Sequence, residues 1–202
     1  MFTYYHNMNI YIDSINNPTY QNEFKQRKVD FNKFHERQKI VGQHLKAKYL
    51  GLPYLDVLKG IPFVKNKHAK PYLKSKKCFF NISNSYELVI LVTGSSDLGV
   101  DIEKKRDFSY KRITSAFNPD ELDYLSKQVG TEQSIMTLKL WTIKESVLKQ
   151  VGVGLSGNPK SVHIDLENLQ YANRDNCIYL LQDLNFFDKY LGTIAIKQEK
   201  CD

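Results

Sequence analysis

The longest stretch with a single hydrophobic period runs from Glu132 to Val151 and predicts a helix. Its apolar side chains recur at helical spacing, at Ile135, Leu138, Trp141, Leu148 and Val151. Gly152 follows directly, and glycine commonly ends a helix because it tolerates a positive φ. A second helix start precedes this one at Asn118–Glu121, with Asn as N-cap, Pro at the first helical position and Glu at the third.

Short apolar runs bounded by turn residues predict strands before and after these helices. Phe79–Ser83 and Leu88–Thr93 form the first pair, and Leu88–Thr93 is nearly all apolar, so we expect it in the centre of a sheet. Leu98–Glu103 follows the turn at Gly94–Asp97. Three closing strands are expected, at Val162–Leu166, Cys177–Gln182 and Tyr190–Ile196.

A basic helix is expected near the start of the chain, over residues 31–50. Phe34, Val41 and Leu45 lie near one stripe of it, and Gly51 and Pro53 end it. Helices and strands thus alternate irregularly along the chain, which predicts an α+β protein. The turn at 94–97 lies near the middle of the 202 residues, so two lobes of about equal size are expected.

The composition places the chain among globular proteins of a reducing compartment. The start has no basic stretch followed by an apolar one, and no apolar run approaches the length of a membrane span. Cys78, Cys177 and Cys201 are odd in number and widely spaced, without a metal-ligand pattern. We therefore expect a cytoplasmic protein with reduced thiols and no membrane partner.

The charge of the chain is uneven. Residues 21–80 hold fifteen Lys and Arg against four Asp and Glu, whereas the whole chain has a net charge of +7. Such a segment favours an anionic partner, which is a nucleic acid, a polyphosphate ligand or an acidic protein surface. The alternative is a solvated basic face without a partner.

Two carboxylates stand out in the strand predicted at Leu98–Glu103. Side chains of a strand alternate between its faces, so Asp101 and Glu103 project to one side with Ile102 opposite. Neighbouring carboxylates repel, and a cation between them relieves the repulsion. Mg²⁺ prefers oxygen ligands of this kind. The alternative is an ordinary polar face of an edge strand.

The long helix carries a second group of charged side chains. Trp141, Glu145 and Lys149 follow at four-residue steps and share a face. Either Glu145 and Lys149 form a surface ion pair, or Glu145 joins the strand carboxylates as a third metal ligand. Glu121 has an equally simple structural explanation as a capping residue. The run Gly152–Gly157 follows a helix, so its spacing indicates a helix end and not a dinucleotide site.

Taken together, these segments resemble the signature of the phosphopantetheinyl transferase superfamily. The family pattern is G-[VI]-D-[VI]-E, followed by W-[STC]-x-K-E-[AS]-x-x-K. The chain matches it over 99–103 and 141–149, with about forty residues between the two segments. Upstream, Lys70-Pro71-Tyr72 is similar to the family's G-K-P element, and 80–83 is similar to its F-N-[IL]-S strand. Ala69 and Asn84 depart from the family, which usually has Gly and His at these positions.

This resemblance implies a particular architecture. At 202 residues the chain looks like the long, monomeric type that activates peptide and polyketide synthetases. That type has two similar lobes related by a pseudo-twofold axis, each a small, mostly antiparallel sheet packed against a long helix. We expect an N-terminal lobe over 1–96 on the coenzyme A side, and a C-terminal lobe over 97–202 with the metal site.

The resemblance also implies an activity, the transfer of 4′-phosphopantetheine from coenzyme A to a serine of an apo acyl or peptidyl carrier protein. Asp101, Glu103 and Glu145 would hold Mg²⁺, and 3′,5′-ADP would leave. Lys144 and Lys149 would contact the pyrophosphate. The general base would be Glu145 or Glu121, with Glu145 favoured.

Further residues would bind coenzyme A. Ser83 and Asn84 would touch phosphate, and backbone near Lys70 and Pro71 would contact adenine. The 3′-phosphate would meet basic side chains of the first helix and its flank, at Lys33, Lys46 and Lys48. Two other functions stay open. A weak relative would bind coenzyme A or a carrier for regulation, and a basic protein would bind nucleic acid, although the chain has no nucleic-acid motif.

Overall fold

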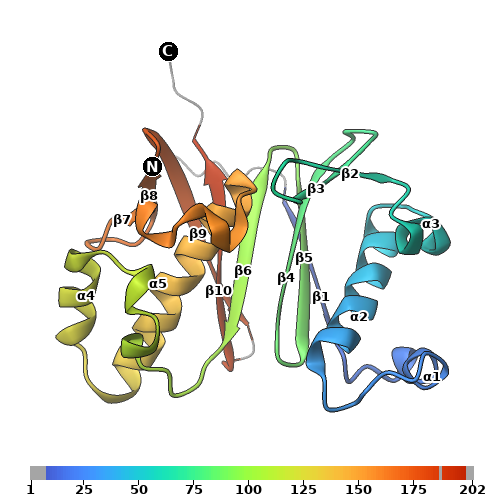
Figure 1. Ribbon diagram of the computed structural model, residues 1–202, viewed down its shortest axis with the longest axis horizontal. Coiled ribbons are helices and arrows are strands. Elements are labelled where there is room, and N and C mark those ends of the chain that lie inside the picture. The colour runs from blue at the N-terminus through green and yellow to red at the C-terminus, as the bar shows by residue number, and fades with distance from the viewer. Residues whose placement is uncertain (1–7, 187, 199–202) are drawn as a thin grey trace. The chain divides into compact units, whose positions relative to one another are not determined.

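The computed structural model describes residues 8–186 and 188–198, so Cys201 and the first residues of the chain lie outside it. The chain divides into two compact units (Figure 1). The first comprises residues up to 66 together with 71–96, and the second comprises 67–70 and the chain from 97 onward. Residues 67–70 pack with the second unit, and the two-lobe division at residue 96 stays a prediction.

The first unit is built on an antiparallel sheet of order β1-β5-β4. β5 (Leu88–Gly94) lies between β1 (Asn9–Ser14) and β4 (Phe79–Ser85) and is buried at every residue. This confirms the central position that its apolar run predicted, because a central strand covered on both faces has no polar side. β1 was not predicted, since its six residues mix polar and apolar side chains.

Three helices and a small hairpin complete the first unit. The bounds are Gln21–Gln26 for α1, Phe34–Tyr49 for α2, Tyr54–Lys59 for α3, Phe63–Lys65 for β2 and Pro71–Leu73 for β3. α2 confirms the helix predicted over 31–50, and its Val41 and Leu45 enter the core with Phe24 and Leu91. Phe34, which we expected on the apolar stripe, is 39% exposed instead.

The second unit has a five-stranded antiparallel sheet of order β6-β10-β9-β8-β7. The bounds are Leu98–Lys104 for β6, His163–Ile164 for β7, Tyr171–Arg174 for β8, Cys177–Phe186 for β9 and Tyr190–Lys197 for β10. The predicted strand at 162–166 is shortened to two residues, and β8 was not predicted.

Two α-helices are described in this unit, of which the longer packs on the sheet and the shorter packs on the longer one. α4 (Pro119–Ser126) begins with the predicted capping box of Asn118 and Glu121. α5 (Gly130–Val151) lies against β6 and β10 and ends at Gly152, whose φ is 77° (Figure 1). Its burial differs from the predicted stripe, because Thr142 through Leu148 are all buried. A helix covered on most sides carries no clean amphipathic signal.

The architecture is therefore α+β, with a mostly antiparallel sheet packed against a long helix in each unit, as predicted. The pseudo-twofold relation between the lobes stays a prediction. Within the described part of the chain, no helix combines the length and apolarity needed to cross a membrane.

Candidate active site

Gly99 positions the strand that carries the two carboxylates. A Cβ atom at this position would come within 2.0 Å of the Ser146 carbonyl oxygen and 2.4 Å of the Gln150 amide nitrogen. Only glycine permits so close an approach of two backbones. Consequently β6 lies directly on α5, and the side chains of Asp101 and Glu103 are carried toward the helix that bears Glu145.

Each strand carboxylate contacts a basic side chain. The Nζ of Lys149 lies 2.7 Å from Oδ1 of Asp101, which is 6% exposed as a residue. Nη1 of Arg106 donates to Oε2 of Glu103 at 2.8 Å. Arg106 was not predicted, although the basic run 104–106 directly after the carboxylates was a signal for it. Together with Glu145 on α5, the site is a mixed cluster of three acidic and two basic groups.

Glu145 is the most perturbed carboxyl of this cluster. Burial, together with the negative charges of Asp101 and Glu103, raises its pKa to about 7 against the opposing charge of Lys149. Its Oε1 atom is buried without a hydrogen-bond partner among the described residues. A buried carboxyl oxygen without a donor is costly, so this position favours a bound cation or a proton.

The three predicted metal ligands do not form a closed set in the structure. Within residues 8–186 and 188–198, no three His, Cys, Asp or Glu side chains are arranged to hold a metal ion. The donor chemistry nevertheless fits Mg²⁺, because Asp101, Glu103 and Glu145 all present carboxylate oxygens and interact electrostatically. The Oε1 atom of Glu145, which has no hydrogen-bond partner among the described residues, is also suited to bind a cation. The three residues remain a proposed ligand set.

Lys144, which was predicted to contact pyrophosphate, lies in the interior of the second unit. Its side chain is 0% exposed, as is that of its partner Glu121, at 2.8 Å. It also donates to the carbonyl oxygens of Val162 at 2.7 Å and Pro159 at 3.1 Å. An ammonium group has three donors, and all three are satisfied by protein. Burial lowers the pKa of Lys144, and the charge of Glu121 opposes that shift.

Glu121 is equally removed from solvent, so the structure does not support it as a general base. Its Oε2 accepts from the backbone amide of Asn118 at 2.8 Å and from Lys144. Asn118 in turn donates to the carbonyl oxygen of Val162 at 3.2 Å. Glu121 therefore links the start of α4 to α5 and to the segment before β7, which is a structural role.

Lys70 also has a structural role in the second unit. Its Nζ lies 2.6 Å from Oδ1 of Asp97 and 2.7 Å from the carbonyl oxygen of Gln150, near the end of α5. A cation at a helix C-terminus is favourable because carbonyl groups there lack helical partners. Asp97 was not predicted as its partner. The side chain of Lys70 holds residues 67–70 against the second unit, whereas a contact of their backbone with adenine remains a proposal.

The remaining predicted coenzyme A residues lie in the first unit. Asn84 is exposed and donates its Nδ2 to Oε1 of Gln38 at 2.9 Å, whereas Ser83 is buried in β4. Lys46 stands 5.4 Å from the centre of the Phe63 ring, and burial with the charge of Lys39 lowers its pKa. Three further residues were predicted to contact coenzyme A. Pro71 begins β3, Lys33 forms an ion pair with Asp30, and the ammonium of Lys48 lies over the ring of Tyr49.

Comparison with known families agrees with this cluster. Residues 97–195, which carry Asp101, Glu103 and Glu145, match the family model of the 4′-phosphopantetheinyl transferase superfamily. This segment, just under half of the chain, is similar to that superfamily. The strand carboxylates and the long helix both lie in the matched segment.

Curated relatives are 4′-phosphopantetheinyl transferases of bacteria and yeast. The transferase gsp of Aneurinibacillus migulanus is 31% identical over 135 residues, which cover 65% of this chain and 55% of the relative. A transferase of Bacillus subtilis is 34% identical over 98 residues, or 48% of this chain and 44% of the relative. The L-aminoadipate-semialdehyde dehydrogenase-phosphopantetheinyl transferase of Candida glabrata is 23% identical over 141 residues, with 65% and 55% covered. The chain thus spans about half the length of the curated relatives it matches.

Proposed function

We propose that this chain is a member of that superfamily and transfers 4′-phosphopantetheine from coenzyme A to a serine of an apo acyl or peptidyl carrier protein. The observation that carries the proposal is the cluster of Asp101, Glu103, Glu145 and Lys149 in the matched segment. The substrate implied is a dinucleotide-like polyanion with a pyrophosphate. The expected cytoplasmic location and monomeric state belong to the same proposal.

The reaction needs no nucleophile from this chain. The serine oxygen of the carrier forms a bond to the phosphorus of phosphopantetheine, and the bond from that phosphorus to the leaving oxygen breaks. The electron pair stays with 3′,5′-ADP, and the serine proton passes to a base. Glu145 is the proposed base, directly or through water, because Glu121 is buried in an ion pair.

Asp101, Glu103 and Glu145 would hold Mg²⁺. The metal would supply neutralisation of the charge that grows on the pyrophosphate. Lys149 lies 26% exposed beside Asp101, so its ammonium is partly accessible to a phosphate oxygen. Its charge would favour the anionic leaving group in the same way.

The basic charge of the first unit supports the choice of partners. Coenzyme A is polyanionic, and an acidic carrier surface would be attracted to the same face. Lys33, Lys46 and Lys48 are the proposed contacts of the 3′-phosphate, with Ser83, Asn84 and the backbone near Pro71 as further contacts.

Direct transfer is the first expected result. Incubated with coenzyme A, Mg²⁺ and an apo carrier, the protein should add one phosphopantetheine, measured as the intact mass of the carrier. A carrier whose acceptor serine is replaced by alanine is the control. Carriers from peptide, polyketide and fatty-acid systems should be compared. If all of them stay unmodified while coenzyme A still binds, the alternative of a regulatory binding protein is favoured.

Asn84 gives a second expected result, since the family usually has histidine there. Asn84→His should tighten coenzyme A binding as the pH falls from about 8 to 6, because imidazole gains charge in this range. A hydrogen bond to a charged group exceeds a neutral one by about 1 kcal/mol, so the gain in affinity should be about fivefold. The loss of the Gln38 contact opposes it. The measurement is the KM for coenzyme A across this pH range. A histidine at the nearby Asn81 would not serve as a control, because Asn81 is buried.

A KM that stays flat or rises at every pH would remove the phosphate contact assigned to Asn84. Asn173→His is a suitable control, since Asn173 is an exposed strand residue of the second unit and outside the cluster. It introduces the same titrating group in the other unit, at a residue that is not among the proposed phosphate contacts.

A further inference from the structure

A pocket of about 550 Å³ lies in the first unit and is not part of the carboxylate cluster. It is formed by the β2–β3 hairpin, the segment after β3, and the start of β4. Its volume is in the range typical of small-molecule sites. Its lining residues are Val64, Lys65, Asn66, Tyr72, Leu73, Lys74, Lys76, Cys78, Phe79 and Phe80.

The surface of this hairpin pocket is mainly apolar. Val64, Leu73 and the rings of Tyr72, Phe79 and Phe80 account for most of its lining. Phe80 is 3% exposed and belongs to the core of the unit, so this part of the lining is packed against the core. Val64, by contrast, is 48% exposed, although it is a large apolar side chain on a strand. An apolar ligand would remove this surface from water.

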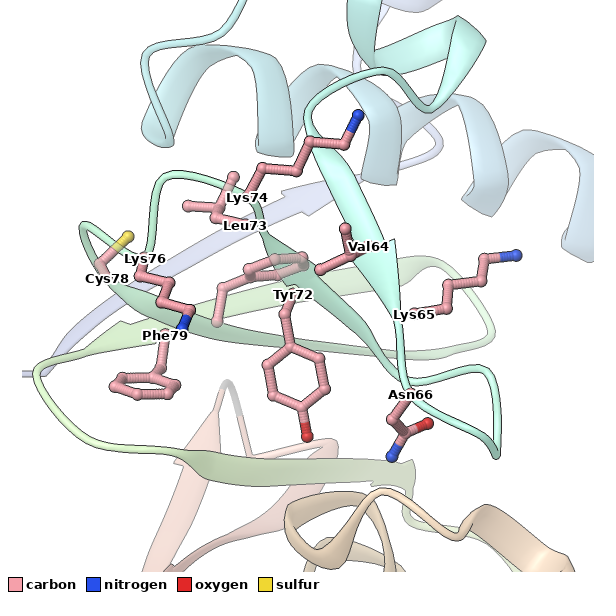
Figure 2. A pocket seen from close by; sticks show the side chains of 10 residues that line it. Val64, Lys65, Asn66, Tyr72, Leu73, Lys74, Lys76, Cys78 and Phe79 are labelled. Atoms are coloured by element: carbon pink, nitrogen blue, oxygen red, sulfur yellow. The ribbon is translucent and has the colours of Figure 1, made fainter.

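The charge around the pocket is entirely positive. Three lysines line it, and none of the described residues that line it is acidic. The bias extends along the chain, because residues 57–86 contain seven lysines and no Asp or Glu. In Figure 2 the side chains of Lys65 and Lys74 extend outward from the hairpin, whereas that of Lys76 runs toward Phe79. Such a rim attracts anions and repels cations.

We propose that the hairpin pocket binds a small organic anion with an apolar body, at a site separate from that of coenzyme A. The apolar body lies between Val64, Tyr72 and Phe79, and the negative group meets the lysines of the rim. A neutral apolar molecule gains only the first interaction, and inorganic phosphate gains only the second. The proposal does not depend on the transferase activity.

Cys78 supplies a local probe of occupancy. Its thiol lines the pocket and is partly buried, and burial raises its pKa, so it reacts slowly with alkylating reagents. A ligand in the pocket should slow this reaction further. The experiment uses the 202-residue chain in which Cys177 and Cys201 are replaced by serine, so that maleimide labelling reports Cys78 alone.

Anilinonaphthalene sulfonate is the anionic probe, and phenylnaphthylamine is its neutral analogue with the same ring system. The sulfonate should protect Cys78 at concentrations about tenfold below those of the neutral analogue, and inorganic phosphate should not protect it. Equal protection by both ring compounds would overturn the anionic preference. An absence of protection by either would overturn the site.

Two matched pairs of variants localise the effect. Val64→Asp places a negative charge on the wall and should weaken sulfonate binding about tenfold or more, whereas Ile61→Asp, at 50% exposure outside the pocket, should not. Lys76→Gln should weaken binding relative to Lys77→Gln, the exposed neighbour that does not line the pocket. Equal effects within both pairs would overturn the assignment.

Coenzyme A distinguishes the two sites. Added at saturation, it should leave the sulfonate titration unchanged within about twofold. Displacement of the sulfonate by coenzyme A would overturn the claim of a separate site. An inactive transferase that still binds the sulfonate at Cys78 would leave this proposal standing, so the failure of one proposal is distinguishable from the failure of the other.

Discussion

Replacing Asp101 with asparagine should lower the rate of phosphopantetheine transfer on the order of 10²-fold or more. Asp101 contributes a carboxylate to the proposed Mg²⁺ site and is the ion-pair partner of Lys149. Asparagine keeps the size of the side chain but loses its charge, so the cation and the lysine both lose a partner. The loss should be in kcat and should persist at high Mg²⁺ if charge stabilisation is the main effect.

The measurement is the initial rate with saturating coenzyme A and apo carrier across a Mg²⁺ titration. Asp123→Asn is the matched control, because Asp123 lies in the same unit and forms an exposed pair with Lys127. That variant should keep transfer within about twofold, since exposed ion pairs contribute little. Near-normal turnover of Asp101→Asn would show that Asp101 is not a metal ligand.

Replacing Lys144 with methionine should lower the free energy of unfolding by about 3–5 kcal/mol. Lys144 and Glu121 are both fully buried, so the variant leaves a carboxylate inside the protein without its counter-charge. The carbonyl oxygens of Val162 and Pro159 lose their donor as well. The effect should appear as a lower denaturant midpoint in urea or guanidinium unfolding.

The control for this prediction is Lys127→Met, which breaks the exposed pair with Asp123 and should cost about 1 kcal/mol or less. Adding Glu121→Gln to Lys144→Met should restore part of the stability, because glutamine is neutral and can still accept from the amide of Asn118. If Lys144→Met unfolds no more easily than Lys127→Met, the ion pair does not hold the second unit together.

Local patterns were sufficient to predict much of the fold. The apolar run at Leu88–Thr93 predicted a central strand, and Asn118 with Glu121 predicted a capped helix start, because both signals depend on residues adjacent in sequence. Alternation along a strand placed Asp101 and Glu103 on one side. β1 and β8 were missed, since short mixed strands are stabilised by their neighbours more than by their own sequence.

The identity of the candidate site residues was determined by the sequence, but the environment of each was decided only by the tertiary structure. Lys144 and Glu145 are neighbours on α5. Lys144 is fully buried in an ion pair with Glu121, whereas Glu145 interacts with Asp101. Helical period could not separate them, because α5 is buried on most sides and lacks a single polar face. Lys70 forms an ion pair with Asp97 and donates to the carbonyl oxygen of Gln150, both of which are distant from it in sequence. Contacts between such distant residues follow from chain packing, which brings charges together and decides which of them water can reach.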